Sequence, residues 1–571
     1  MSKKDTSPSP ISIHDLDFSP KPGKKYWKDG QREWREEFIY FLLVDRFHDD
    51  RKREPKKNNQ LGFGSDDQLR TTCGGTLQGI TSHLGYIKGL GCTSLWLSPV
   101  FENDTFSYHG YAIQNYLAVD QRFGTKEDLV ELVDAAHALD MRVFLDIVLH
   151  HSADTWSYPD SVDYYHYDGV VFPFGQWRSK DLPIPVELRN PDLYGRKGQI
   201  RNYDSYPETR EGDFMALKSF KNDNSPEALY VQDVLTKVHC YWIRETDIDG
   251  FRLDAVKHMG EETISRFCSY VREYAYKLGK KNFFLFGELV GPDQMYNEYI
   301  GPKTSTVVGD KAIYYGLNSV LDFPLYHVLA DVIKGKSTPE RLIDRYESLR
   351  MNALHRGEFG EFLVTFIDNH DQLGQSIKQR FGHEATPNQV VAGIGFLLCA
   401  LGAPCIYYGT EQGFNGAGPG DWSVRETMFS LADPKVNALN QNNTIYQNIA
   451  ILAALRQNTP TLKFGRMYMR EGSHDGINFS LPAHESCLLV FSRVLYDEEI
   501  VVAYNTSVDS VDEEYVEVDS HINPEGSTLQ FIYGQTGKTH VLRSEDGHRH
   551  FIKIKLGPTE FVILSNARSI R

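Results

Sequence analysis

The chain is 571 residues long, and 41% of its residues are hydrophobic and 24% charged, enough to bury a sizeable core in two to four domains. Its 77 acidic and 61 basic residues give a net charge of −16, which argues against a nucleic acid as the main partner. The N-terminal sequence MSKKDTSPSP lacks the apolar core of a signal peptide, and no apolar run is long enough to span a bilayer. We therefore expect a cytoplasmic protein with no membrane partner; the alternative is a secreted protein whose export signal has been removed.

Apolar runs that predict buried strands recur along most of the chain. In chain order they are Phe38–Phe47, Cys92–Val100, Arg142–His151, Asp249–His258, Phe283–Val290, Gly316–Leu325, Phe362–Asp371 and Ala403–Gln412. Segments of helical length lie between them, and one of these opens with Thr125 and Asp128 at capping-box spacing. Repeated βα units of this kind predict either a doubly wound sheet or a closed barrel.

Three other stretches interrupt or flank these units. Residues 1–37 are polar, with several Pro and Lys, and are expected to form a loosely attached N-terminal arm. Residues 153–217 are rich in Tyr, Pro, Asp and Gly without clear periodicity, which predicts a small inserted domain or a functional excursion. From residue 461 to 571 the sequence changes to short alternating runs, which predict an antiparallel β domain.

Polar side chains stand at the carboxyl ends of four predicted strands. If the strands form a barrel, these ends meet at its mouth, where barrel enzymes place their active sites. The residues concerned are Asp146, His151, Arg252, Asp254, Glu288, His370 and Asp371.

The surroundings of Asp254 and Glu288 predict different pKa values for these two carboxyl groups. Arg252 and Asp254 lie on the same face of their strand, so we expect the guanidinium to lower the pKa of Asp254 and keep it ionised. Glu288 ends an apolar strand, where burial would raise its pKa. Two carboxyl groups tuned apart in this way are typical of glycoside hydrolysis. The alternative for Arg252 and Asp254 is a buried structural ion pair.

Four segments in chain order carry a family resemblance, and three more support it. They are DIVLHH at Asp146, GFRLDAVKH at Gly250, GELV at Gly287 and FIDNHD at Phe366, with VDRF at Val44, SYHGYAIQNY at Ser107 and YYGTEQ at Tyr407. The chain resembles the α-amylase family of glycoside hydrolases from about residue 38 to 460. The resemblance implies an α/β fold: a (β/α)₈ TIM barrel of residues 38–152 and 218–460, an inserted domain of residues 153–217 after strand 3, and a C-terminal antiparallel β-sandwich of residues 461–571.

The resemblance also assigns roles to the residues at the mouth. Asp254 would be the nucleophile, Glu288 the general acid/base, and Asp371 would bind sugar hydroxyls and help distort the ring. Asp146 would anchor Arg252, which orients Asp254. The residues implied in substrate binding are His109, Tyr111, His151, Arg252, Lys257, His258 and His370.

A structural Ca²⁺ between the barrel and the inserted domain is a further implication of the resemblance, and no organic cofactor is expected. Asp213 and the backbone carbonyl of His258 are the implied ligands. His150 stands where the family has an Asn ligand, and imidazole binds calcium poorly.

Three functions stay open at this point. The first is a retaining hydrolase of α-1,4-glucans such as starch, glycogen or maltodextrin. The second is a 4-α-glucanotransferase or another maltodextrin- or cyclodextrin-processing enzyme that uses the same residues. The third is a catalytically silent scaffold or transporter subunit, which would have lost the three carboxylates that this chain retains. The expected partner is an α-glucan, and the sequence predicts no oligomeric state.

Overall fold

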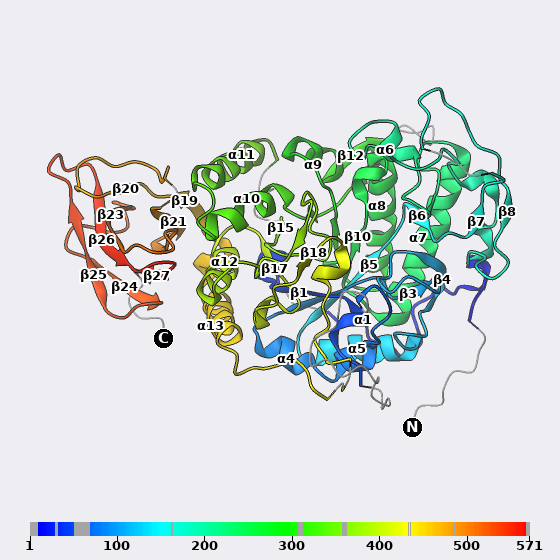
Figure 1. Cartoon of the computed structure of the whole chain (residues 1–571), viewed down its shortest axis with the longest axis horizontal. Helices are drawn as coiled ribbons and strands as arrows, with labels where there is room; N and C mark the ends of the chain where they lie inside the picture. The colour runs from blue at the N-terminus through cyan, green and yellow to red at the C-terminus, as the bar shows by residue number, and fades with distance from the viewer. Residues whose placement is uncertain are drawn as a thin grey trace.

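The computed structural model describes residues 9–28, 32–50, 69–160, 164–305, 312–356, 363–431, 433, 435–484 and 486–566. Among them, no helix is both long and apolar enough to cross a membrane. The molecule is elongated, with a barrel at its centre and a C-terminal sheet at one end (Figure 1).

The central barrel is an eight-stranded parallel sheet in the order β14-β11-β10-β5-β2-β1-β17-β15. Its strands are β1 (Ile39–Leu42), β2 (Ser94–Leu97), β5 (Arg142–Ile147), β10 (Gly250–Leu253), β11 (Phe284–Gly287), β14 (Ser319–Val320), β15 (Val364–Thr365) and β17 (Ala403–Tyr407). A bridge between Leu321 and Val364 joins the two ends of the sheet. The predicted (β/α)₈ barrel is confirmed, and the doubly wound alternative is wrong.

Helices link successive strands and cover the outside of the barrel (Figure 1). The longer helices are α5 (Lys126–Ala138), α7 (Pro226–Thr246), α8 (Glu261–Lys277), α10 (Phe323–Ile333), α11 (Glu340–Arg356), α12 (Pro387–Cys399) and α13 (Thr444–Asn458). The shorter elements around the barrel are α1 (Val44–Phe47), α3 (Leu77–Thr81), α4 (Leu84–Gly89), α9 (Asp293–Tyr299), α14 (Pro460–Phe464), β3 (Phe101–Asn103), β4 (Ile113–Val119), β12 (Pro302–Ser305), β13 (Ala312–Tyr315), β16 (Lys378–Gln379) and β18 (Ala417–Gly418).

The segment between β5 and α7 contains little regular structure. Strand β6 (His151–Ser152) pairs antiparallel with β9 (Lys218–Ser219), and β7 (Trp156–Ser157) pairs with β8 (Gln176–Trp177). One short helix, α6 (Glu208–Glu211), lies within it. The ring of Trp156 is fully buried, and it packs against the rings of Tyr158, Phe174 and Tyr194. Many aromatic residues of this segment therefore form a small core.

A nine-stranded antiparallel sheet forms the C-terminal part of the chain, in the order β19-β21-β22-β27-β24-β25-β26-β23-β20. Its strands are β19 (Arg466–Met469), β20 (Gly472–Ser473), β21 (Leu488–Leu495), β22 (Glu498–Asn505), β23 (Asp512–Val518), β24 (Thr528–Tyr533), β25 (Lys538–Arg543), β26 (His550–Leu556) and β27 (Phe561–Ser565). The prediction of an antiparallel β domain is confirmed.

Alternate residues of the central strands of this sheet pack into two different hydrophobic cores. In β21, Leu488 and Val490 belong to a core within the C-terminal sheet, whereas Leu489 and Phe491 belong to the core that includes the barrel. Because side chains alternate between the two faces of a strand, one face of this sheet packs against the barrel side and the other packs within the domain.

The N-terminal segment closes the amino end of the barrel. Trp34 stacks on Phe284 at the start of β11, with ring centroids 4.0 Å apart, and the Arg142 guanidinium lies 4.1 Å from the centroid of its ring. The backbone N–H of Trp27 donates to Asp247 Oδ2 at 2.8 Å. The described part of the predicted arm therefore packs on the barrel and is not loosely attached. Residues 1–8 and 29–31 lie outside the described residues.

Candidate active site

One guanidinium joins three carboxylates from three neighbouring strands. Arg252 in β10 stands beside Asp146 in β5, and the next pair in register places Leu253 beside Gly287, directly before Glu288. Arg252 Nη1 donates to Asp146 Oδ1 at 2.8 Å and to Asp254 Oδ1 at 2.6 Å. Arg252 Nη2 lies 3.3 Å from Glu288 Oε2. Parallel in-register strands thus gather these residues at the carboxyl end of the barrel.

The turn after β10 also orients Glu288. Ala255 has a positive φ of 53°, an uncommon conformation for a residue with a side chain. Its backbone N–H donates to Glu288 Oε2 at 3.0 Å, and the N–H of Val256 donates to the Glu288 carbonyl at 3.0 Å. The strained turn therefore holds the Glu288 carboxyl group in a fixed position.

The two carboxyl groups that face Arg252 differ in their pKa. Burial raises the pKa of Glu288 to about 7 and that of Asp254 to about 6, although Arg252 lowers both. We expected Arg252 to bring the pKa of Asp254 below its usual range. The net shift is upward because burial outweighs the guanidinium and because Asp146 adds a second negative charge. The order expected of an acid and a nucleophile, with Glu288 the higher, is retained.

Asp146 is fully engaged by hydrogen bonds. Besides Arg252, it accepts from the Tyr111 hydroxyl at 2.8 Å and from Trp96 Nε1 at 3.1 Å, both on Oδ2. The Tyr111 ring in turn lies parallel to His370, with centroids 5.4 Å apart and planes 14° apart. Tyr111 and His370 therefore border the same carboxylate cluster.

Asp371 is held by a residue that sequence reasoning missed. Arg425 Nη2 donates to Asp371 Oδ1 at 2.6 Å, and Arg425 Nε donates to the His370 carbonyl at 2.8 Å. His370 Nε2 lies 3.2 Å from Asp371 Oδ2. Arg425 directly follows the short helix η8 (Asp421–Val424), well after the end of the barrel strand β17, and no motif in the sequence marks it.

Two further histidines contact the Tyr111 backbone. The N–H of Tyr111 donates to His109 Nδ1 at 3.0 Å, and His151 Nε2 donates to the Tyr111 carbonyl at 3.1 Å. Burial lowers the pKa of His109 to about 3 and that of His151 to about 4. Both are therefore neutral near pH 7 and act as hydrogen-bonding groups there.

Lys257 and His258 face the inserted segment. Lys257 Nζ donates to Asp204 Oδ1 of that segment, and His258 Nδ1 donates to the Thr209 carbonyl at 2.6 Å. The His258 ring also packs on Phe214, with centroids 4.5 Å apart. Among the contacts of the described residues, none joins either side chain directly to the carboxylate cluster.

The groups around Asp213 do not fit a calcium ion, which takes six to eight oxygen ligands. Asp213 Oδ2 accepts from the Tyr158 hydroxyl at 2.7 Å and Oδ1 from the Ser219 N–H at 2.9 Å. Burial raises the pKa of Asp213 to about 6, and the nearby Lys218 cation offsets only part of this shift. His150, in place of an oxygen ligand, packs edge-on against Phe214.

The closed barrel, the segment inserted after its third strand and the carboxylates at the strand ends define a barrel enzyme of the glycosidase type. The family model described as the alpha amylase catalytic domain matches residues 41–450. The chain therefore belongs to the alpha-amylase family.

Proteins similar to this chain include alpha-amylases and cyclomaltodextrin glucanotransferases. An alpha-amylase of Streptomyces lividans is 30% identical over 458 residues, which cover 69% of this chain and 47% of that protein. A cyclomaltodextrin glucanotransferase of Klebsiella oxytoca is 27% identical over 514 residues, covering 83% and 70%. The crystal structure of an Anoxybacillus alpha-amylase matches with a TM-score of 0.68 and 27% identity, covering 94% of this chain and 98% of that one. The chain spans about half the length of the Streptomyces relative.

Proposed function

We propose that this protein is a retaining glycoside hydrolase that cleaves α-1,4-linked glucans by double displacement. The observation that carries the proposal is the contact of one buried guanidinium, that of Arg252, with both Asp254 and Glu288. Retaining glycosidases need a nucleophile and an acid/base that flank the glycosidic bond to be cleaved, with their carboxyl groups about 5 Å apart. An α-glucan is the proposed substrate because the family and its relatives carry the names alpha-amylase and cyclomaltodextrin glucanotransferase.

In the first step, the Asp254 carboxylate attacks the anomeric carbon while the bond to the glycosidic oxygen breaks. Glu288 gives its proton to the departing oxygen, so the reducing-end fragment leaves as an alcohol. In the second step, Glu288 takes a proton from water, whose oxygen attacks the same carbon and releases Asp254. Two inversions give net retention of the α configuration.

The neighbouring residues would bind and orient the sugar. We propose that Asp371, fixed by Arg425, accepts hydrogen bonds from sugar hydroxyls and favours the distorted ring. Tyr111 would provide an aromatic platform, and Asp146 would keep Arg252 in place. The proposed hydrogen-bonding or leaving-group contacts come from His109, His151, His370, Lys257 and His258.

The nucleophile assignment is tested by Asp254→Asn. The amide keeps the shape of the carboxylate but cannot form the glycosyl-enzyme, so kcat on maltooligosaccharides should fall at least about a thousandfold. Circular dichroism should show the same fold. The matched control is Asp233→Asn, an exposed acid on α7 paired with Lys237, which should keep wild-type activity. More than a few per cent of residual activity in Asp254→Asn would exclude this nucleophile.

Transfer to a sugar acceptor is the second candidate function, and the similarity to cyclomaltodextrin glucanotransferases favours it. Chromatography of the products from maltotriose separates the two. Hydrolysis gives only shorter sugars, whereas transfer also gives longer ones. The same assay on cyclodextrins tests whether rings are opened.

We also propose that hydrogen bonds, rather than calcium, hold the junction of the barrel and the inserted segment at Asp213. Adding CaCl₂ to chelator-treated protein should leave both the melting temperature and the hydrolysis rate unchanged. A rise of several degrees with calcium alone would contradict this. The division into units at residues 38–152 with 218–460, 153–217 and 461–571, and the cytoplasmic location, stay predictions.

A further inference from the structure

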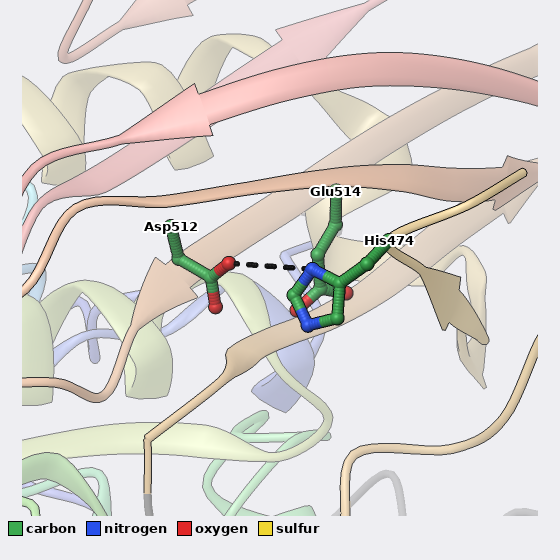
Figure 2. A group of neighbouring side chains, drawn as sticks. All are labelled: His474, Asp512 and Glu514. Atoms are coloured by element: carbon green, nitrogen blue, oxygen red, sulfur yellow. Dashed lines mark ion pairs between the residues drawn. The ribbon is translucent and has the colours of Figure 1, made fainter.

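Three potential metal ligands meet in the C-terminal sheet, outside the barrel. Asp512 and Glu514 are two residues apart on β23, so their side chains share one face. Strand β20 pairs antiparallel with β23, with Ser473 opposite Tyr515, and the next residue, His474, comes to lie beside Glu514. Each of the three side chains offers a ligand atom within 4.8 Å of the others. Figure 2 shows the three groups pointing toward one another.

The cluster is short of positive charge. Glu514 is only 6% exposed, and Asp512 is half-buried beside it. Among the described residues, no Lys or Arg forms an ion pair with either carboxylate; His474 Nδ1, 3.7 Å from Asp512 Oδ1, is the one basic group at ion-pair distance. Two adjacent carboxylates with one buried are unfavourable unless a cation or a proton offsets their charge.

The backbone holds the cluster in a defined place. A Cβ at Gly472 would lie 2.1 Å from Glu514 Oε2, so a side chain at this position would displace the carboxylate from its present place. Beyond His474, the Asp475 carboxylate accepts from the N–H groups of Ile477 and Asn478, each at 2.8 Å, which fixes a tight turn. The His474 side chain is 73% exposed, so solvent and ions reach the site.

We propose that His474, Asp512 and Glu514 bind a divalent transition-metal ion of the zinc type. One imidazole nitrogen and two carboxylate oxygens suit Zn²⁺ better than Ca²⁺, and water would complete the four ligands. Zn²⁺ bonds of about 2.1 Å require the ligand atoms to come within roughly 3.5 Å of one another, which rotation of the exposed imidazole would allow. Because β20 ends the sheet, the ion would tie this edge strand to β23.

Isothermal titration calorimetry of the full-length, chelator-treated protein with ZnCl₂ tests the site. We expect saturable binding that includes one site whose affinity for zinc falls at least about tenfold in His474→Ala. Glu514→Gln keeps the shape, removes the charge and should weaken binding similarly. His521→Ala, which removes an exposed histidine elsewhere in the same domain, should bind as the wild type does.

Two results would overturn the proposal. The first is a wild-type protein without saturable zinc binding up to millimolar concentration, in which case a proton shared by the carboxylates offsets their charge. The second is a His474→Ala variant that binds zinc as tightly as the wild type does. If Glu514→Gln does not fold, the exposed His474 variant decides alone, because its side chain contributes little to packing.

Discussion

Arg252 is the only cation in direct contact with Asp146, Asp254 and Glu288 among the described residues, and its side chain is 1% exposed. One positive charge cannot balance three negative charges in a buried site, so a proton is retained on the most weakly acidic group. Glu288 is that group, because its pKa is the highest of the three. The charge balance at the mouth of the barrel thus prepares Glu288 to act as an acid.

The pH dependence of activity should follow from these two carboxyl groups. Catalysis needs Asp254 deprotonated, so kcat/KM should fall as pH drops below about 6, and it needs Glu288 protonated, so kcat/KM should fall as pH rises above about 7. Glu288→Gln should lose the alkaline fall on an aryl α-maltoside with a good leaving group, since that substrate needs no proton. An unchanged alkaline fall in the variant would assign it to another group.

Helix α5 shows how a local signal sets an element boundary. Thr125 at its N-cap accepts from the Asp128 N–H through its hydroxyl, and the Asp128 carboxylate accepts from the Thr125 N–H at 2.8 Å. The buried face consists of Leu129, Leu132, Val133 and Ala136. Both features depend on residues close together in the sequence, which is why the capping spacing predicted them.

Thr125→Ala should lower the free energy of unfolding by about 1 kcal/mol, because the N–H of Asp128 loses its acceptor. Thr125→Ser is the matched control, since it keeps the hydroxyl and should stay close to the wild type. Denaturant unfolding followed by circular dichroism measures both. Equal stability of the alanine and serine variants would mean that the cap contributes nothing.

Contacts that follow neither from a local pattern nor from the ends of the barrel strands could not be predicted from the sequence. The strands and the convergence of Arg252, Asp254 and Glu288 were predictable, because apolar runs and the geometry of barrel strand ends are local or general. Arg425 was not, since it follows the short helix η8 rather than a barrel strand, and no periodicity points to its contact with Asp371. The net direction of the Asp254 pKa shift also failed, because it is a sum over burial and several charges that only the folded chain defines.

At the scale of the whole molecule, the C-terminal sheet is bound to the barrel by more than apolar contact. Arg493 of β21 is 1% exposed, and its Nη1 donates to three backbone carbonyls. They belong to Cys399 and Ala400 at the end of α12, at 2.7 Å each, and to Leu462 in α14, at 2.9 Å. Carbonyls at the end of a helix lack partners within it, so this side chain satisfies acceptors of the barrel from the C-terminal sheet.

Arg493→Met should therefore lower the stability of the barrel and of the C-terminal sheet together. Methionine retains much of the apolar length but leaves several buried carbonyls without a donor, each costing about 1–3 kcal/mol, so we expect a loss of roughly 3 kcal/mol or more. Arg549→Met, in a partly exposed pair with Glu471, is the control and should cost no more than about 1 kcal/mol. Unfolding in guanidinium chloride can be followed by far-ultraviolet circular dichroism and by hydrolytic activity. In Arg493→Met, the midpoints of both signals should shift to a lower denaturant concentration. If activity kept its wild-type midpoint while the C-terminal sheet unfolded early, the sheet would be a separate unit, and the barrel would not depend on it for stability.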